Sequence, residues 1–147
     1  MPFRFALAPI LRLRQSIERQ RTLQLQEANL RVSRAQQEVV QLDRFLVSSD
    51  QSDSAALAAG RTAAELQFIA VLRKNLIAYR EELQSDVRKF EQLRQKALAE
   101  YHQAYRDREI LEGLRARERE AYQQEQTRRQ QQELDAAHLL QRWHRRR

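Results

Sequence analysis

Apolar residues in the first part of the chain recur at alternating steps of three and four positions. This alternation is typical of a helix whose apolar seam packs in a coiled coil. We expect this helix over about residues 10–47, directly after Pro9, because a proline in the first helical turn loses no hydrogen bond. The predicted seam positions are Leu25, Ala28, Val32, Ala35, Val39, Leu42 and Leu46.

A second and longer helix is predicted over about residues 61–140, where no proline interrupts the chain. Thr62 and Glu65 have the spacing of a capping box, which satisfies free backbone N–H groups at a helix start. A four-residue step to Val87 breaks the alternation, and such a step predicts a local relaxation of the supercoil. The seam positions around this step are Ile69, Leu72, Leu76, Tyr79 and Leu83, then Phe90, Leu93, Ala97, Tyr101 and Ala104.

The segment between the two helices, residues 48–60, is rich in serine and aspartate and ends in Gly60, which predicts a turn. A connection this short makes the helices antiparallel. The predicted fold is therefore all-α, a two-helix antiparallel coiled-coil hairpin that forms a single domain over residues 1–147, with a basic tail at 141–147.

The two arms of this hairpin are unequal, roughly 55 Å and roughly 120 Å long at 1.5 Å per residue. Folding at about residue 54 places Ile10 level with about residue 98. Beyond that point the second helix overhangs, at the end that carries both termini, with an apolar stripe that needs another partner. The stripe consists of Tyr101, Tyr105, Ile110, Leu111, Leu114, Tyr122, Leu134, Leu139 and Leu140.

Composition narrows the function classes. Two glycines and two prolines are too few for a fold rich in turns, and the absence of cysteine excludes disulfides and thiolate metal sites. The net charge is +7, with +4 in residues 1–21, +4 in residues 136–147 and −1 between them. The positive excess therefore lies at the two termini, which the hairpin brings to one end.

We expect no catalytic residue, no cofactor and no metal site. An enzyme needs convergent groups in a pocket that excludes water, and two packed helices leave little concavity. No pair of histidines has the spacing of a helical zinc site, and no glycine-rich phosphate loop occurs. The three histidines, His102, His138 and His144, are expected to be solvated surface residues.

The basic ends leave other partners open. A basic coiled coil that binds nucleic acid or anionic membrane through its termini is the alternative function, although the ends lack the side-chain pattern of specific DNA recognition. Peripheral membrane contact through residues 3–17 and self-association of two overhangs are also compatible with the sequence. Trp143 is a candidate anchor in a partner pocket, and Gly113 marks either a bend or a close contact.

Three local segments resemble those of the FliJ family of bacterial flagellar export proteins, and the injectisome stalk proteins are similar. The first is the opening, with Phe3-Arg4-Phe5 and Leu11-Arg12-Leu13-Arg14. The second is Gln67-Phe68-Ile69 with Leu72 and Leu76-Ile77. The third is the tail with Glu125-Gln126, Arg129-Gln130 and Glu133-Leu134-Asp135.

The resemblance implies a non-enzymatic stalk, similar to the γ stalk of rotary ATP synthases, in the bacterial cytoplasm and peripheral at the inner membrane. Its end with both termini would insert into the hexameric ring of the flagellar export ATPase. It would also contact the membrane export gate protein FlhA and assist export chaperones and substrates. Candidate ring contacts at that end are Arg12, Arg14, Tyr122, Arg129, Leu134, Leu139 and Arg142.

Candidate gate contacts lie on the half near the turn. Carried over by position, they are Leu42, Phe45, Phe68, Leu72 and Tyr79, while Asn75 and Ser49 depart from the family pattern. Phe45 and Phe68 lie off the predicted seam, and we favour them as contacts. For Leu42, Leu72 and Tyr79, which lie on the seam, packing between the helices is an equal alternative.

Overall fold

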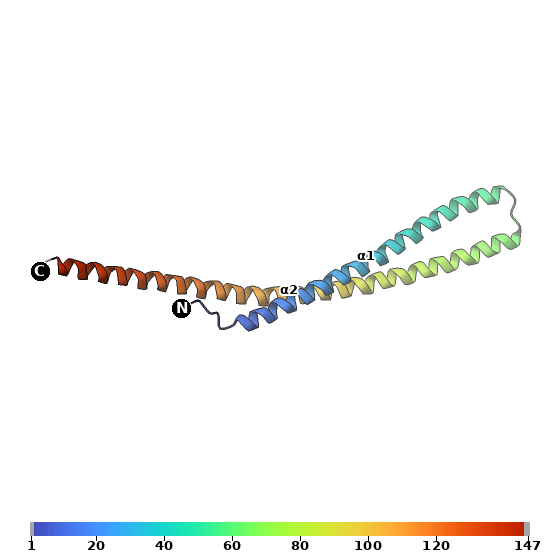
Figure 1. Cartoon of the computed structure of the whole chain (residues 1–147). Helices are drawn as coiled ribbons and strands as arrows, with labels where there is room; N and C mark the ends of the chain where they lie inside the picture. Colours follow the sequence, from blue (N-terminus) through green and yellow to red (C-terminus); the bar gives the residue numbers. More distant parts are fainter. Residues whose placement is uncertain (1, 146–147) are drawn as a thin grey trace. The chain divides into compact units, whose positions relative to one another are not determined.

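The computed structural model describes residues 2–145, and within them the chain forms two helices and no strand. Helix α1 spans Ala8–Ala58 and helix α2 spans Ala63–His144 (Figure 1). The helices pack against each other in antiparallel orientation, so the predicted all-α hairpin is confirmed. The chain divides into two compact units, residues 1–19 with 103–147 (unit 1) and residues 20–102 (unit 2).

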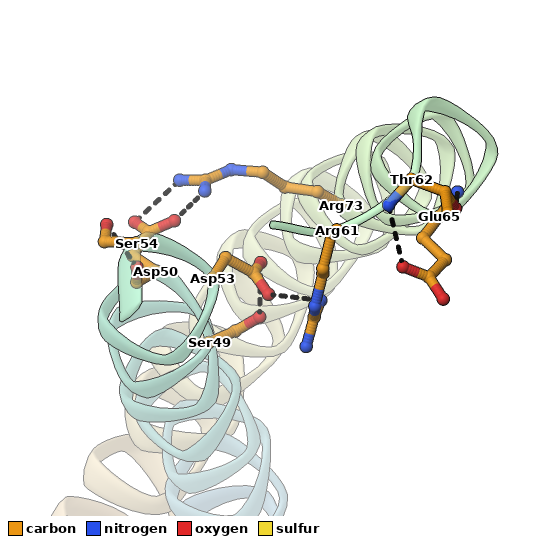
Figure 2. Close-up of polar contacts among 8 residues, drawn as sticks. All are labelled: Ser49, Asp50, Asp53, Ser54, Arg61, Thr62, Glu65 and Arg73. Atoms are coloured by element: carbon orange, nitrogen blue, oxygen red, sulfur yellow. Dashed lines mark hydrogen bonds and ion pairs between the residues drawn. The ribbon is translucent and has the colours of Figure 1, made fainter. Parts of the chain in front are cut away.

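The connection between the helices is formed by residues whose local pattern can be recognised in the sequence. Gly60 follows the end of α1 with a φ of 85°, a left-handed conformation that glycine adopts without strain. Thr62 directly precedes α2 and caps it: its N–H donates to Glu65 at 3.1 Å, and the Glu65 N–H donates to the Thr62 hydroxyl at 3.4 Å (Figure 2). The predicted capping box is thus present, and residues 59–62 suffice for the connection.

The serine- and aspartate-rich segment forms the last three turns of α1, so the turn predicted over residues 48–60 is shorter than expected. Ser54 donates to the Asp50 carbonyl at 2.8 Å, and Ser49 donates to Asp53 at 3.4 Å. The same two carboxylates form ion pairs beyond α1, Asp50 with Arg73 of α2 and Asp53 with Arg61 of the connection (Figure 2). Because these polar side chains are satisfied along the helix, they do not end it.

The longer α1 changes the register of the helices. In unit 1, Arg14 pairs with Asp107 at 3.0 Å, which puts Ile10 about one turn beyond Asp107 on α2. The prediction that Ile10 lies level with about residue 98 was therefore wrong, because the chain folds back later than expected. In consequence Tyr101 and Leu111 are half-buried, whereas Ile110 stays exposed.

Every predicted seam residue of α1 is buried or half-buried, and Val32 and Ala35 belong to the core. On α2 three seam predictions were wrong: Leu72, Tyr79 and Leu93 are 46%, 51% and 52% exposed. Arginines take the inward positions instead, because a long aliphatic stem can lie in the seam while the guanidinium reaches a carboxylate. The three and four alternation then runs without a break through Leu76, Arg80, Leu83, Val87, Phe90, Arg94, Ala97, Tyr101, Ala104, Arg108 and Leu111.

Gly113 lies inside α2, and a Cβ built on it meets no atom within 4 Å. Close contact is therefore not the reason for this glycine, and Gly113→Ala should stabilise the protein by up to about 1 kcal/mol, since alanine is the better helix former. Thermal unfolding followed by circular dichroism measures the effect, with Ala116→Gly on the same exposed stretch as a control that should destabilise it. A lower melting temperature for Gly113→Ala would instead indicate a bend that alanine opposes.

Candidate docking surfaces

Unit 1 is held together by a polar network between α1 and α2. Glu18 pairs with Arg108, and both side chains are more than four-fifths buried. Arg108 also pairs with Glu112 at 2.5 Å, and Gln15 donates to the same carboxylate at 3.3 Å. The guanidinium carbon of Arg108 lies 5.0 Å from the centre of the Tyr105 ring, within cation–π range. Arg108 is thus committed to the hairpin and unsuited to a partner contact.

In unit 2 the ion pairs between the helices reverse their sign along α1. Arg21 of α1 pairs with Glu100 of α2 at 2.7 Å. Nearer the connection, α1 supplies the acids: Asp43 pairs with Arg80, and Asp50 with Arg73. If the α1 helices of two copies of the chain paired in parallel, side chains of like charge would lie next to each other. This pattern of charges therefore disfavours such a pairing.

Two carboxyl groups that pair with arginine have a lowered pKa, Asp43 in a pair between the helices and Glu91 in a pair within α2. The hydrogen bond from Arg80 lowers the pKa of Asp43, and the one from Arg94 lowers the pKa of Glu91. A carboxyl with a lower pKa in the folded state stabilises the fold above its unfolded pKa of about 4. That stabilisation is lost as the pH falls through the lower, folded value. The Asp43–Arg80 pair therefore supports the hairpin at neutral pH, the Glu91–Arg94 pair supports α2, and both weaken in acid.

Large apolar side chains are exposed on both helices near the connection in unit 2, and we call this set the apolar tip surface. Residues 40–79 carry equal numbers of basic and acidic side chains, so charge does not steer a partner to it. Exposed apolar side chains in this number are a feature from which a contact with another protein can be proposed. Its members are Phe45, Val47, Leu57, Phe68, Val71, Leu72, Ile77 and Tyr79.

Four of the five candidate gate contacts belong to the apolar tip surface. Phe45, Leu72 and Tyr79 each directly precede an a position of the heptad pattern, and such g positions share one flank of an antiparallel pair. The exposure of Leu72 and Tyr79 disfavours the alternative that they pack between the helices. Leu42 is half-buried in the α1 seam, as that alternative expects. Phe68 is 69% exposed.

The segment before α1 covers α2 in unit 1. Phe5 is buried, and the Phe3 ring packs on Tyr122 with 5.7 Å between ring centroids. Residues 2–7 are not helical, which corrects the expectation of a membrane-facing helix from residue 3 to residue 17. Two aromatic residues at spacing two before Pro9 were the available signal for this contact.

The candidate ring contacts all lie in unit 1, which carries fifteen basic and nine acidic residues by sequence. Arg14 is engaged with Asp107, Tyr122 with Phe3, and Arg129 with Glu125 at 2.9 Å. The remaining four have no cross-helix role and are exposed. They are Arg12, Leu134, Leu139 and Arg142.

Sites of other kinds are not found in the described part of the chain. Residues 2–145 contain no group of three or more side chains that could hold a metal ion. Neither helix, over the residues described, has an apolar stretch able to cross a bilayer. Trp143, at the end of α2, is 54% exposed, and its ring lies 5.6 Å from that of His144.

The fold defines an all-α protein of the helical-hairpin class, with exposed apolar side chains near the connection and an excess of basic residues in unit 1. The family model described as "Flagellar FliJ protein" matches residues 3–147. The chain therefore belongs to the FliJ family and is a component of the flagellar export apparatus. Neither a curated protein nor a solved structure gives a match to this chain.

Proposed function

We propose that this protein is the non-enzymatic central stalk of the flagellar export ATPase ring and links that ring to the export gate. The observation that carries the proposal is the part of α2 beyond Tyr122. Residues 123–144 form a continuation of the helix that neither α1 nor the N-terminal segment covers in the described structure. A helix left bare in this way is marginal alone and is stabilised by a partner.

In this proposal unit 1 enters the ring, and its net charge of +6 favours a ring interior of negative potential. The apolar tip surface of unit 2 contacts the gate protein FlhA, with Phe45, Phe68, Leu72 and Tyr79 as the contact residues. Association with the inner membrane is then peripheral and passes through FlhA. Contacts with export chaperones and substrates would use the same exposed apolar side chains.

An ATPase assay tests the proposal. The export ATPase from the same cell, titrated with this protein at near-physiological salt, should show saturable stimulation and more hexamer by sedimentation. Leu72→Ser together with Tyr79→Ser serves as the control, because these substitutions alter the other surface and should leave the stimulation unchanged.

The outcome that favours the alternative function is equally specific. Absence of stimulation, together with binding to DNA or anionic vesicles that falls steeply with salt, would indicate a polyanion-binding coiled coil. The net charge of unit 1 is the observation that keeps this alternative, since a basic end attracts any polyanion.

A further inference from the structure

The outer face of α1 in unit 2 carries a second series of positions at alternating steps of three and four residues. These are the b and f positions of the heptad pattern, on the side opposite the inward seam. Every member is exposed, four are apolar and only one is charged. We call this series the outer seam, and it consists of Leu23, Gln26, Leu30, Ser33, Gln37, Val40, Arg44 and Val47.

The outer seam is symmetric about Ala35. Leu23 and Val47 are equally far from this residue along the chain, and so are Leu30 and Val40. In an antiparallel coiled coil, the two kinds of seam position lie opposite each other. Two α1 helices paired in this way about Ala35 would place Leu23 of each copy opposite Val47 of the other. The same alignment places Leu30 opposite Val40, so the surface is complementary to itself about a two-fold axis.

The single charge of the outer seam also finds a partner in this alignment. Arg44 falls between Leu23 and Leu30 of the other copy, in a hole that Gln26 and Glu27 complete. Glu27 is exposed and pairs at 2.6 Å with an arginine of its own helix, so it can accept a second arginine. The arginines of α2 enter the inward seam in the same way, with the stem among apolar side chains and the guanidinium on a carboxylate.

The surface of α1 is hollowed where the other copy would insert. Spacings of three and four divide the residues around this shallow hollow into two neighbouring holes of a knobs-into-holes interface. In the alignment about Ala35, the two holes receive Leu23 and Gln26 of the other copy. The residues that line the hollow are Val40, Asp43, Arg44, Val47, Ser48 and Gln51.

Charge sets the orientation of such a pair. Residues 20–34 carry three arginines and one acid, whereas residues 36–50 carry one arginine and three acids. Antiparallel pairing about Ala35 sets the basic half of each copy against the acidic half of the other, and parallel pairing sets like halves together. One like-charge contact remains, because Arg34 lies beside the two-fold axis and faces Arg34 of the other copy at the rim.

We propose that the outer seam of α1 binds a second copy of this chain in an antiparallel, two-fold symmetric pair about Ala35. The inference goes beyond the proposed function and does not depend on it, because the outer seam contains none of the candidate ring or gate contacts. Each copy contributes four apolar side chains and one charged contact. We therefore expect a reversible dimer with a dissociation constant on the order of tens of micromolar.

Introduced cysteines test the register, because the chain has no cysteine of its own. Leu30→Cys and Val40→Cys chains, mixed and oxidised well above the expected dissociation constant, should form a disulfide-linked dimer, since opposite seam positions lie within disulfide reach. Neither chain alone should cross-link, because identical positions are then ten residues apart, about 15 Å along the helix. Equal cross-linking of each chain alone overturns the inference, and so does a wild-type chain that sediments as a monomer at the same concentration.

A charge swap tests the contact between copies. Arg44→Glu should raise the dissociation constant of the dimer by about tenfold or more, since it sets a carboxylate beside Glu27 of the other copy. The double variant with Glu27→Arg should recover the dimer, and Arg34→Gln should strengthen it by removing the like-charge contact. Arg88→Glu, exposed on α2, is the matched control and should leave the dimer unchanged. An Arg44→Glu chain that dimerises as the wild type does, or a double variant without recovery, overturns the inference.

Discussion

A chain truncated after Tyr122 should keep its folded hairpin and lose its ability to stimulate the export ATPase. The contacts that hold unit 1 end at Tyr122, so removal of residues 123–147 breaks no contact between α1 and α2 and leaves the Phe3 ring on Tyr122. The same deletion removes Arg129, Leu139 and Trp143 together with the basic tail. We expect a melting temperature within a few degrees of the full chain and stimulation reduced to the basal rate.

Circular dichroism and the ATPase titration measure the two effects in the same samples. A deletion that retains stimulation would show that the ring contact lies elsewhere. A deletion that unfolds the hairpin would show that residues 123–144 stabilise it, contrary to the contacts described. The Ala116→Gly variant, destabilised but of full length, is the control that separates loss of stability from loss of contact.

The second large effect is on stability. Leu83 lies in the core of unit 2 and is 7% exposed, so Leu83→Ala should reduce the free energy of unfolding by about 2–4 kcal/mol. Leu93→Ala is the matched control: the same atoms are removed from a side chain that is 52% exposed, and the expected change is below about 1 kcal/mol.

Urea unfolding followed at 222 nm gives both values. The comparison also separates the structure from the apolar pattern, because spacing alone puts both leucines in the seam. Equal losses for the two variants would support that simpler pattern and contradict the inward position of Arg94.

The fold could be predicted from the sequence because its main signals are local. Steps of three and four among aliphatic residues locate the α1 seam, and Thr62 with Glu65 locates the start of α2. The end of α1 could not be predicted in the same way. Asp50 stays helical because Arg73 pairs with it, and a contact across the hairpin leaves no sign in the local pattern.

The α2 seam was less predictable because an apolar pattern does not include arginine. Arg80 and Arg94 lie inward through their stems, so Tyr79 and Leu93 were assigned to the seam in their place. Leu72 and Tyr79, two of the candidate gate contacts, are consequently exposed and do not pack in the seam. The candidate ring contacts in unit 1 stay predictions. Side chains among them, such as Arg12 and Leu139, are exposed in a single chain, so the fold does not indicate which of them a partner would bind.

The four-residue connection also sets an order in which the hairpin can close. The pair Asp50–Arg73 joins residues 23 positions apart, whereas Arg14–Asp107 joins residues 93 positions apart. Closing a longer loop costs more chain entropy, so contacts near the connection can form first and those near the termini follow. The Phe3–Tyr122 contact, which encloses nearly the whole chain, is then the last to form.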